Sequence, residues 1–110
     1  MIKEKQPKSL PIIGDKPHHP NSNFKFPKRE IFGKSRSCMH EWFTKFSWLH
    51  YDENEDKVYC FLCVKSLKDN LCTSESISKS SEAFIYHGFN FWNKALERFK
   101  MHEDSKEHRV

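Results

Sequence analysis

Two pairs of metal-binding residue types constrain this chain more than any other feature of its sequence. Cys60 and Cys63 are separated by two residues, and His102 and His108 follow after an interval of 38 residues. Zinc prefers four sulfur or nitrogen ligands in a tetrahedron, and a close cysteine pair with two histidines near a helix end supplies such a set. The pattern therefore predicts a cofactor, one structural zinc ion bound by these four residues. A shell closed by four protein ligands leaves no place for an activated water, so we expect no catalysis here.

The two histidines impose a condition on the structure around them. Six positions turn a regular helix through about 240°, so both side chains can reach one ion only if the helix ends between them. The three residues after His102 are where we expect that end. Two substitutes for a histidine ligand stay open, Cys72 in a serine-rich stretch and His87. Cys38 lies on an apolar stripe, where a buried free thiol is expected.

The four cysteines also allow a disulfide framework, which is typical of small secreted proteins. The first twenty residues contain no continuous apolar stretch of the kind that a secretory signal needs. We therefore expect a reducing compartment, where close cysteine pairs hold metal or do redox work. A redox role for this pair would need a βαβ context, which the sequence lacks.

The size and composition of the chain predict one small domain with a core made mostly of rings. The chain has 110 residues, and aromatic residues, including ten Phe, make up 15% of them. A chain of this length buries a modest core and often needs a staple, so we expect no enzyme and no cleft for a small-molecule substrate. No run of about 18 apolar residues is present, so no membrane span is expected.

The first half of the chain divides into a leader, a short helix and a hairpin. Residues 1–28 hold all five prolines and predict a basic, disordered leader, with the folded module at 29–110. Apolar residues at helical spacing predict a helix over about 37–46, capped by a serine. Two aromatic runs, 48–51 and 57–61, flank an acidic turn and predict a β-hairpin that delivers Cys60 to a tight knuckle.

The second half of the chain contains a loop and a helix. Residues 66–82 are rich in serine and predict an exposed loop. A helix is expected from near Phe91, capped by Asn90. The fold class predicted is a small α+β zinc finger, in which the hairpin with its cysteine knuckle packs on the C-terminal helix. The expected core consists of Trp48, Tyr59, Phe61, Trp92, Leu96 and Phe99.

Positive charge is concentrated in the first third of the chain. Residues 1–36 hold nine Lys or Arg against three acids, and residues 37–110 hold ten against twelve. A basic leader favours contact with phosphates, although a solvated linker has the same composition. Acids nearly cancel the cations near the last helix, which are our candidate DNA contacts: Lys94, Arg98, Lys100, Lys106 and Arg109.

Several aromatic motifs occur in an order that resembles a known family, the TTF-type zinc finger. The resemblance spans about residues 24–109. Its motifs are Phe26-Pro27-Lys28-Arg29, Trp42-Phe43, Trp48-Leu49-His50-Tyr51, Val58-Tyr59-Cys60-Phe61-Leu62-Cys63, Gly88-Phe89-Asn90-Phe91-Trp92-Asn93-Lys94-Ala95 and the final His102 and His108. Such modules occur near the N-terminus of hAT-type transposases and of transposase-derived MYM-type zinc finger relatives.

The resemblance implies a nuclear zinc-binding module that takes part in DNA recognition, with the same four ligands. It does not account for Cys38, and no transposase catalytic domain is expected in this chain. Two alternatives stay open: a zinc-stabilised module that binds a protein partner without binding DNA, and a decayed transposon fragment. Salt-dependent DNA binding would separate the first alternative from the main hypothesis, because phosphate contacts release counterions.

Overall fold

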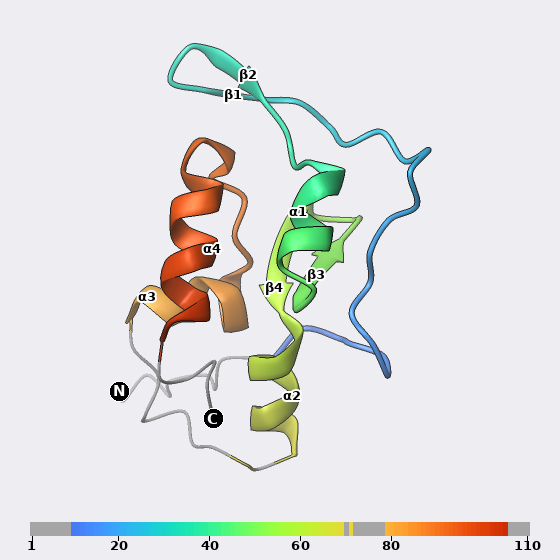
Figure 1. Cartoon of the computed structure of the whole chain (residues 1–110), viewed down its shortest axis with the longest axis vertical. Helices are drawn as coiled ribbons and strands as arrows, with labels where there is room; N and C mark the ends of the chain where they lie inside the picture. Colours follow the sequence, from blue (N-terminus) through green and yellow to red (C-terminus); the bar gives the residue numbers. More distant parts are fainter. Residues whose placement is uncertain (1–9, 70, 72–78, 106–110) are drawn as a thin grey trace, which may run out of the picture.

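Two antiparallel hairpins and a set of short helices make up the chain in its computed structural model, which describes residues 10–69, 71 and 79–105 (Figure 1). The molecule is a small α+β structure that ends in a C-terminal helix. The strands are β1 (Arg29–Ile31), β2 (Lys34–Arg36), β3 (Leu49–Asp52) and β4 (Lys57–Cys60). The helices are α1 (His40–Lys45), α2 (Phe61–Lys68), α3 (Lys79–Glu82), a π-helical turn (Ala83–His87), a 3-10 turn (Trp92–Lys94) and α4 (Ala95–Glu103). No helix within these described ranges is both long and apolar enough to cross a membrane.

The predicted hairpin is confirmed and forms the centre of the fold. β3 and β4 pair with Leu49 opposite Cys60, and their alternating aromatic and β-branched residues suit a buried pleated surface. The acidic turn folds on itself, because the Asp52 carboxylate accepts hydrogen bonds from two backbone amides of the turn. Phe89 adds a further bridge to β4, exchanging both backbone hydrogen bonds with Val58 at 2.9 Å. We call β3, β4 and their turn the buried hairpin.

The core is a cluster of aromatic rings, as the composition predicts. Phe99 of α4 is fully buried, and five rings surround it with centroid distances of 5.5–6.1 Å. Those rings come from α1, the loop that follows it and the region 84–89: Trp42, Phe46, Trp48, Phe84 and Phe89. Most pairs meet edge to face, which the aromatic quadrupole favours. Of the predicted core residues, all except Leu96 are buried.

Leu96 is a wrong prediction with a geometric cause. The helix was expected to run from near Phe91, but Trp92 lies in a 3-10 turn and α4 begins only at Ala95. A 3-10 turn has three residues per turn instead of 3.6, so the expected spacing from Trp92 no longer places Leu96 on the buried face. Leu96 is 49% exposed, and the buried stripe of α4 is Ala95, Phe99 and His102. The expected Asn90 cap is also wrong, because Lys94 precedes α4 without a side-chain cap.

The disordered leader is a wrong prediction for residues 10–28, whereas residues 1–9 lie outside the described part. The segment has no helix or strand, but two of its rings contact Tyr51 edge to face, Phe24 at 5.7 Å and Phe26 at 5.0 Å. His18 accepts a backbone hydrogen bond from Tyr51 and donates its own amide to His50. The segment is ordered because it buries apolar rings, and prolines reduce the entropy lost when it does so.

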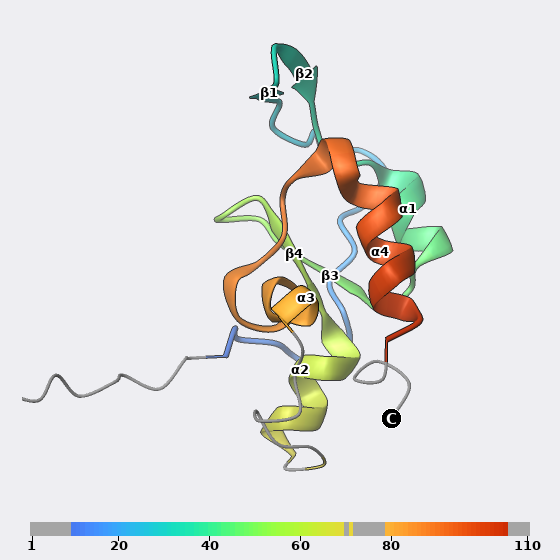
Figure 2. The ribbon, with the colours of Figure 1, turned by 90° about the vertical axis from the view of Figure 1, so that its left-hand side faces the viewer.

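The hairpin β1–β2 was not predicted. It is joined by the two-residue turn Phe32-Gly33, in which both residues have positive φ, and it projects from one end of the molecule (Figure 2). At the base of this hairpin, Arg29 donates a hydrogen bond of 2.7 Å to the Asp56 carboxylate in the turn of the buried hairpin. We call residues 28–36 the basic ribbon, since they hold four basic residues and one acid.

Two smaller expectations about helices also differ. Helix α1 begins at His40, and Met39 precedes it without the serine cap that was expected. Residues 66–68, expected in a loop, form the last turn of α2. The hairpin end is therefore followed by a helix, which fixes the direction in which the cysteines point.

Candidate metal centre

Three of the four predicted ligands meet in the interior of the molecule. The ligand atoms of Cys60, Cys63 and His102 all lie within 4.8 Å of one another. Each residue is at most 3% exposed. Two come from adjacent elements, the end of β4 and the first turn of α2, and the third comes from the last turn of α4, which is distant in sequence. The cluster could therefore hold a metal ion where the hairpin, α2 and the C-terminal helix meet.

The two cysteines are positioned by the junction between β4 and α2. Cys60 ends the strand and caps the helix, and its sulfur accepts a hydrogen bond from the Cys63 amide at 3.5 Å. This arrangement gives the tight return that the spacing predicted, with an α-helix continuing from it. A sulfur at a helix N-terminus faces the positive end of the helix dipole, which favours the thiolate that metal binding needs.

His102 is held in place by contacts on both nitrogens and on the faces of its ring. Its Nε2 lies 3.4 Å from the Cys63 sulfur, and its Nδ1 lies 3.2 Å from the Ser81 hydroxyl. Phe84 stacks on the ring at 4.7 Å, and Trp48 packs against it at 5.2 Å. With Nε2 bound to a metal, Nδ1 would carry the ring proton and donate a hydrogen bond to the Ser81 hydroxyl oxygen, which is the outer contact expected of a metal-binding histidine.

The donor set and its spacing fit zinc. Bonds of about 2.3 Å to sulfur and about 2.0 Å to nitrogen in a tetrahedron place those two donors about 3.5 Å apart. The observed 3.4 Å between Cys63 Sγ and His102 Nε2 matches this value. Two sulfurs and one imidazole nitrogen are the ligands that zinc accepts most readily in structural sites.

Helix α4 ends within the three residues after His102, where the sequence predicted its end. α4 stops at Glu103, and the Ser105 hydroxyl donates to the His102 carbonyl at 2.6 Å, closing the last turn. His108 and the alternative ligand Cys72 lie outside the described residues. The other alternative, His87, is exposed and belongs to no metal-type cluster in the described part of the chain.

Ser81 is a site residue that the sequence did not reveal. It is 1% exposed, although it comes from a serine-rich stretch that predicts an exposed loop. One serine in such a stretch carries no signal that distinguishes it from its neighbours. Its role becomes visible only when α3 is seen beside the end of α4, where the two views agree (Figures 1 and 2).

Cys38 is separate from the metal cluster and differs from it in chemistry. It is 2% exposed within the aromatic core. Burial raises the pKa of the Cys38 thiol to about 12. The thiol therefore stays protonated at neutral pH, which is the buried free cysteine that was expected.

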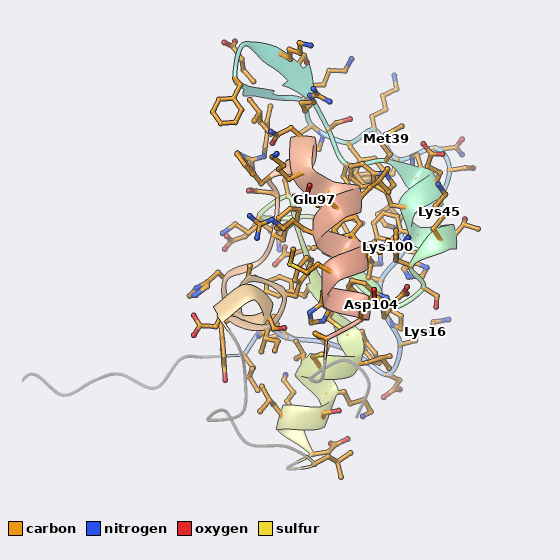
Figure 3. The ribbon with its side chains drawn as sticks, turned by 60° about the vertical axis from the view of Figure 1, so that its left-hand side comes forward. Lys16, Met39, Lys45, Glu97, Lys100 and Asp104 are labelled. Atoms are coloured by element: carbon orange, nitrogen blue, oxygen red, sulfur yellow. The ribbon has the colours of Figure 1, made fainter. Side chains whose placement is uncertain are left out.

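The expected DNA contacts on α4 lie on a surface of mixed charge. Lys94, Arg98 and Lys100 are exposed. Figure 3 shows Lys100 between Glu97 and Asp104 along the outer side of the helix. Lys106 and Arg109 lie outside the described residues. Within the described part, α4 alone therefore offers no strongly positive face.

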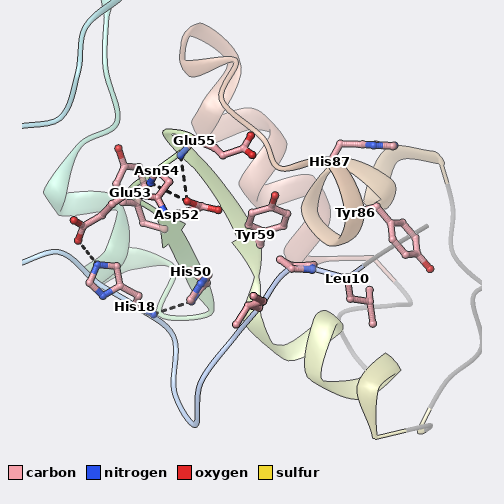
Figure 4. Close-up of a pocket in the computed structure, with 13 residues that line it drawn as sticks. Leu10, His18, His50, Asp52, Glu53, Asn54, Glu55, Tyr59, Tyr86 and His87 are labelled. Atoms are coloured by element: carbon pink, nitrogen blue, oxygen red, sulfur yellow. Dashed lines mark hydrogen bonds and ion pairs between the residues drawn. The ribbon is translucent and has the colours of Figure 1, made fainter. Parts of the chain in front are cut away.

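A hollow of about 790 Å³ lies beside the turn of the buried hairpin (Figure 4). Three of the carboxylates from that turn line it, and Glu53 pairs with His18 at its edge. Burial and the neighbouring His18 lower the pKa of His50 on its wall, so this ring is neutral at neutral pH. The hollow is thus acidic, which makes this side of the molecule unsuited to phosphate.

A comparison of the chain with protein-family models and with solved structures finds no match in either.

Proposed function

We propose that this chain is a zinc-stabilised DNA-recognition module of the TTF type. The observation that carries the proposal is the buried cluster of Cys60, Cys63 and His102, whose two thiols and one imidazole are donor types that structural zinc sites use. His108 is the fourth ligand in this proposal, six residues beyond His102 and past the end of α4.

The bound ion would stabilise the folded state of the chain. A structural zinc in a small finger contributes roughly 10–16 kcal/mol near neutral pH, and the ligands must be thiolates and neutral imidazoles. Cys60 and Cys63 hold the ion at the end of the hairpin, and His102 holds it at the end of α4. Two contacts within the chain orient these donors. The Ser81 hydroxyl contacts the imidazole of His102, and the Cys63 amide at the start of α2 donates to the Cys60 sulfur.

DNA is the partner that the charge distribution favours. The chain carries a net charge of +4, and residues 1–36 alone carry +6, because nine Lys or Arg outnumber three acids. Positive charge concentrated in one region binds phosphate and makes the affinity depend on salt. A nuclear location follows from this role, and a transposase or a protein derived from one is the proposed parent.

The direct test is binding of the zinc-loaded full chain to duplex DNA, measured by fluorescence anisotropy at several salt concentrations. We expect affinity to fall linearly with salt on logarithmic axes, and to disappear when a chelator removes the metal. His108→Ala should release zinc and abolish binding, whereas His87→Ala, at an exposed histidine outside the cluster, should do neither. Zinc-loaded protein that binds no duplex at low salt would refute DNA recognition and favour the protein-interaction alternative.

A further inference from the structure

The basic ribbon combines three features: excess positive charge, an exposed aromatic tip and projection from the body. Residues 28–36 hold four basic residues against Glu30, a net charge of +3. Phe32 at the tip is 81% exposed. The ribbon extends beyond the rest of the molecule in both orthogonal views (Figures 1 and 2).

The register of the ribbon separates its charges. Arg29 pairs with Arg36 and Ile31 with Lys34, so these four lie on one face. Glu30 pairs with Ser35 on the other face. Directly opposed like charges destabilise a hairpin, but Arg29 is neutralised by the buried carboxylate of Asp56. The cations left to meet an outside partner are Lys34, Arg36 and Lys28, all of them exposed.

The first position of the ribbon's turn holds a residue type that this kind of turn disfavours. A two-residue turn with positive φ at both positions favours Asn-Gly. Here the first position is Phe32, with φ of 51°. A bulky residue in the left-handed region is uncommon and costs free energy. An aromatic ring that is both costly and exposed indicates selection for something other than stability.

A second ring, directly before the 3-10 turn Trp92–Lys94, contacts the tip. Phe91 is 40% exposed and meets Phe32 edge to face at 5.7 Å. Lys94 follows Phe91 by one turn and is exposed as well. The ribbon and the turn that precedes α4 therefore form one aromatic and basic surface, on which Phe32 is more exposed than Phe91.

We infer that the basic ribbon is the DNA-contacting element, and that it enters the major groove with Phe32 against the base edges and Lys34 and Arg36 on phosphates. The inference rests on the proposed DNA-binding function and replaces α4 as the main contact. The major groove, about 12 Å wide and 8.5 Å deep, admits a two-stranded ribbon. Strands of three residues span roughly 10 Å at about 3.3 Å per residue, a length comparable with the depth of the groove. An aromatic side chain there contacts the thymine methyl group.

The experiment uses the zinc-loaded full chain and a fluorescent duplex with a randomised centre, from which the preferred sequences are selected first. Lys34→Ala with Arg36→Ala should reduce the salt slope by about 1.8, as expected for two lost phosphate contacts. Lys65→Ala with Lys68→Ala removes the same charge from exposed positions of α2 and should leave this slope nearly unchanged.

The tip is tested with Phe32→Asn, which restores the preferred turn. This variant should be at least as stable as the parent chain, yet bind the selected duplex about tenfold more weakly with an unchanged salt slope. Phe32→Trp should retain most of the affinity. A loss of affinity without a loss of stability is a result that a purely structural role for the ring would not give.

The outcomes separate this inference from the function on which it rests. If the parent chain shows no salt-dependent duplex binding, the proposed function fails, and the ribbon assignment fails with it. If the parent chain binds but Phe32→Asn binds equally well, or the ribbon double variant behaves like the α2 control, the ribbon assignment alone is overturned. Loss of binding in Lys94→Ala with Arg98→Ala, with normal ribbon variants, would then return the contact to α4.

Discussion

The two hairpins of this small protein have similar topology and opposite chemistry. The basic ribbon has strands of three residues, a tight Phe32-Gly33 turn and a net charge of +3. The buried hairpin has strands of four residues, and its turn, residues 52–56, holds four acids and no base. Most residues of the first hairpin are exposed, and most residues of the second hairpin's strands are buried.

The two hairpins have different tasks in this small domain. The buried hairpin supplies the core and places Cys60 beside Cys63, so its sequence is restricted by packing and by the cluster. The basic ribbon is joined to the body by the ion pair of Arg29 with Asp56, whose carboxylate also accepts from Tyr51 at 2.5 Å, by Ile31 packed against the core and by the contact of Phe32 with Phe91. Its cations Lys28, Lys34 and Arg36 are exposed, and the acidic turn contacts the ribbon at its base, through Arg29.

The largest expected effect is removal of the metal, which should unfold the buried hairpin. Cys60→Ser, or a chelator added to the parent chain, should abolish the near-ultraviolet circular dichroism of the ring core, because roughly 10–16 kcal/mol of binding free energy is lost. Cys38→Ser changes an equally buried thiol outside the cluster and should keep the signal. A Cys60→Ser protein with a native aromatic spectrum would show that the core folds without the cluster.

The next effect in size is expected at Gly88, which packs against the buried hairpin. Its φ is 81°, and an added Cβ would lie 2.8 Å from Lys57 Cβ and 3.0 Å from Tyr59 Cζ. We expect Gly88→Ala to lower the free energy of unfolding by about 2–4 kcal/mol, since left-handed backbone and overpacking both contribute. Urea denaturation of the zinc-loaded protein measures the change, and a loss below 1 kcal/mol (roughly, the backbone cost alone) would contradict the packing described here.

Alkaline pH should weaken the buried hairpin more than the basic ribbon. Burial and the hydrogen bond to Asp56 raise the pKa of Tyr51 well above its usual value. A group whose pKa is raised on folding stabilises the protein below its unfolded pKa, about 10 for tyrosine, and loses that contribution as pH rises further. Stability should therefore fall above pH 10 by up to about 1.4 kcal/mol per pH unit. In Tyr51→Phe, which cannot ionise, the fall should be correspondingly shallower in denaturation curves across this range; an identical slope would exclude Tyr51 as the cause.

The smallest effect is expected at the turn of the basic ribbon. Gly33 has φ of 78°, but an added Cβ meets nothing within 4 Å. Gly33→Ala should therefore cost only about 1 kcal/mol, the price of left-handed backbone without a clash. Comparing it with Gly88→Ala by the same urea titration separates backbone cost from packing cost. Equal losses of unfolding free energy at the two glycines would show that Gly88 is packed no more tightly than Gly33.

The same contrast explains which parts of the fold the sequence could predict. The buried hairpin has aromatic and β-branched runs around a polar turn, so its pattern is visible along the chain. The basic ribbon has charged strands and a phenylalanine where Asn is usual, so no local pattern marks it. Its pairing depends on contacts with distant residues, above all Arg29 with Asp56.

The candidate metal centre also has residues that the sequence predicted and one that it did not. Spacing alone indicated Cys60, Cys63 and His102, because ligand chemistry restricts which residue types occur together. Ser81 could not be predicted, since its contact depends on how α3 packs beside α4. Leu96 was misplaced for a related reason: a 3-10 turn changes the phase of the helix, and residue spacing does not report where that turn begins.

We propose that one metal ion joins the buried hairpin to the C-terminal helix, and native mass spectrometry of the zinc-loaded full chain measures whether it is bound. We expect one zinc per chain in the parent protein and in Cys38→Ser, and none in Cys60→Ser or His102→Ala. A parent chain that stays folded without zinc, or a Cys60→Ser variant that retains a full equivalent, would contradict it.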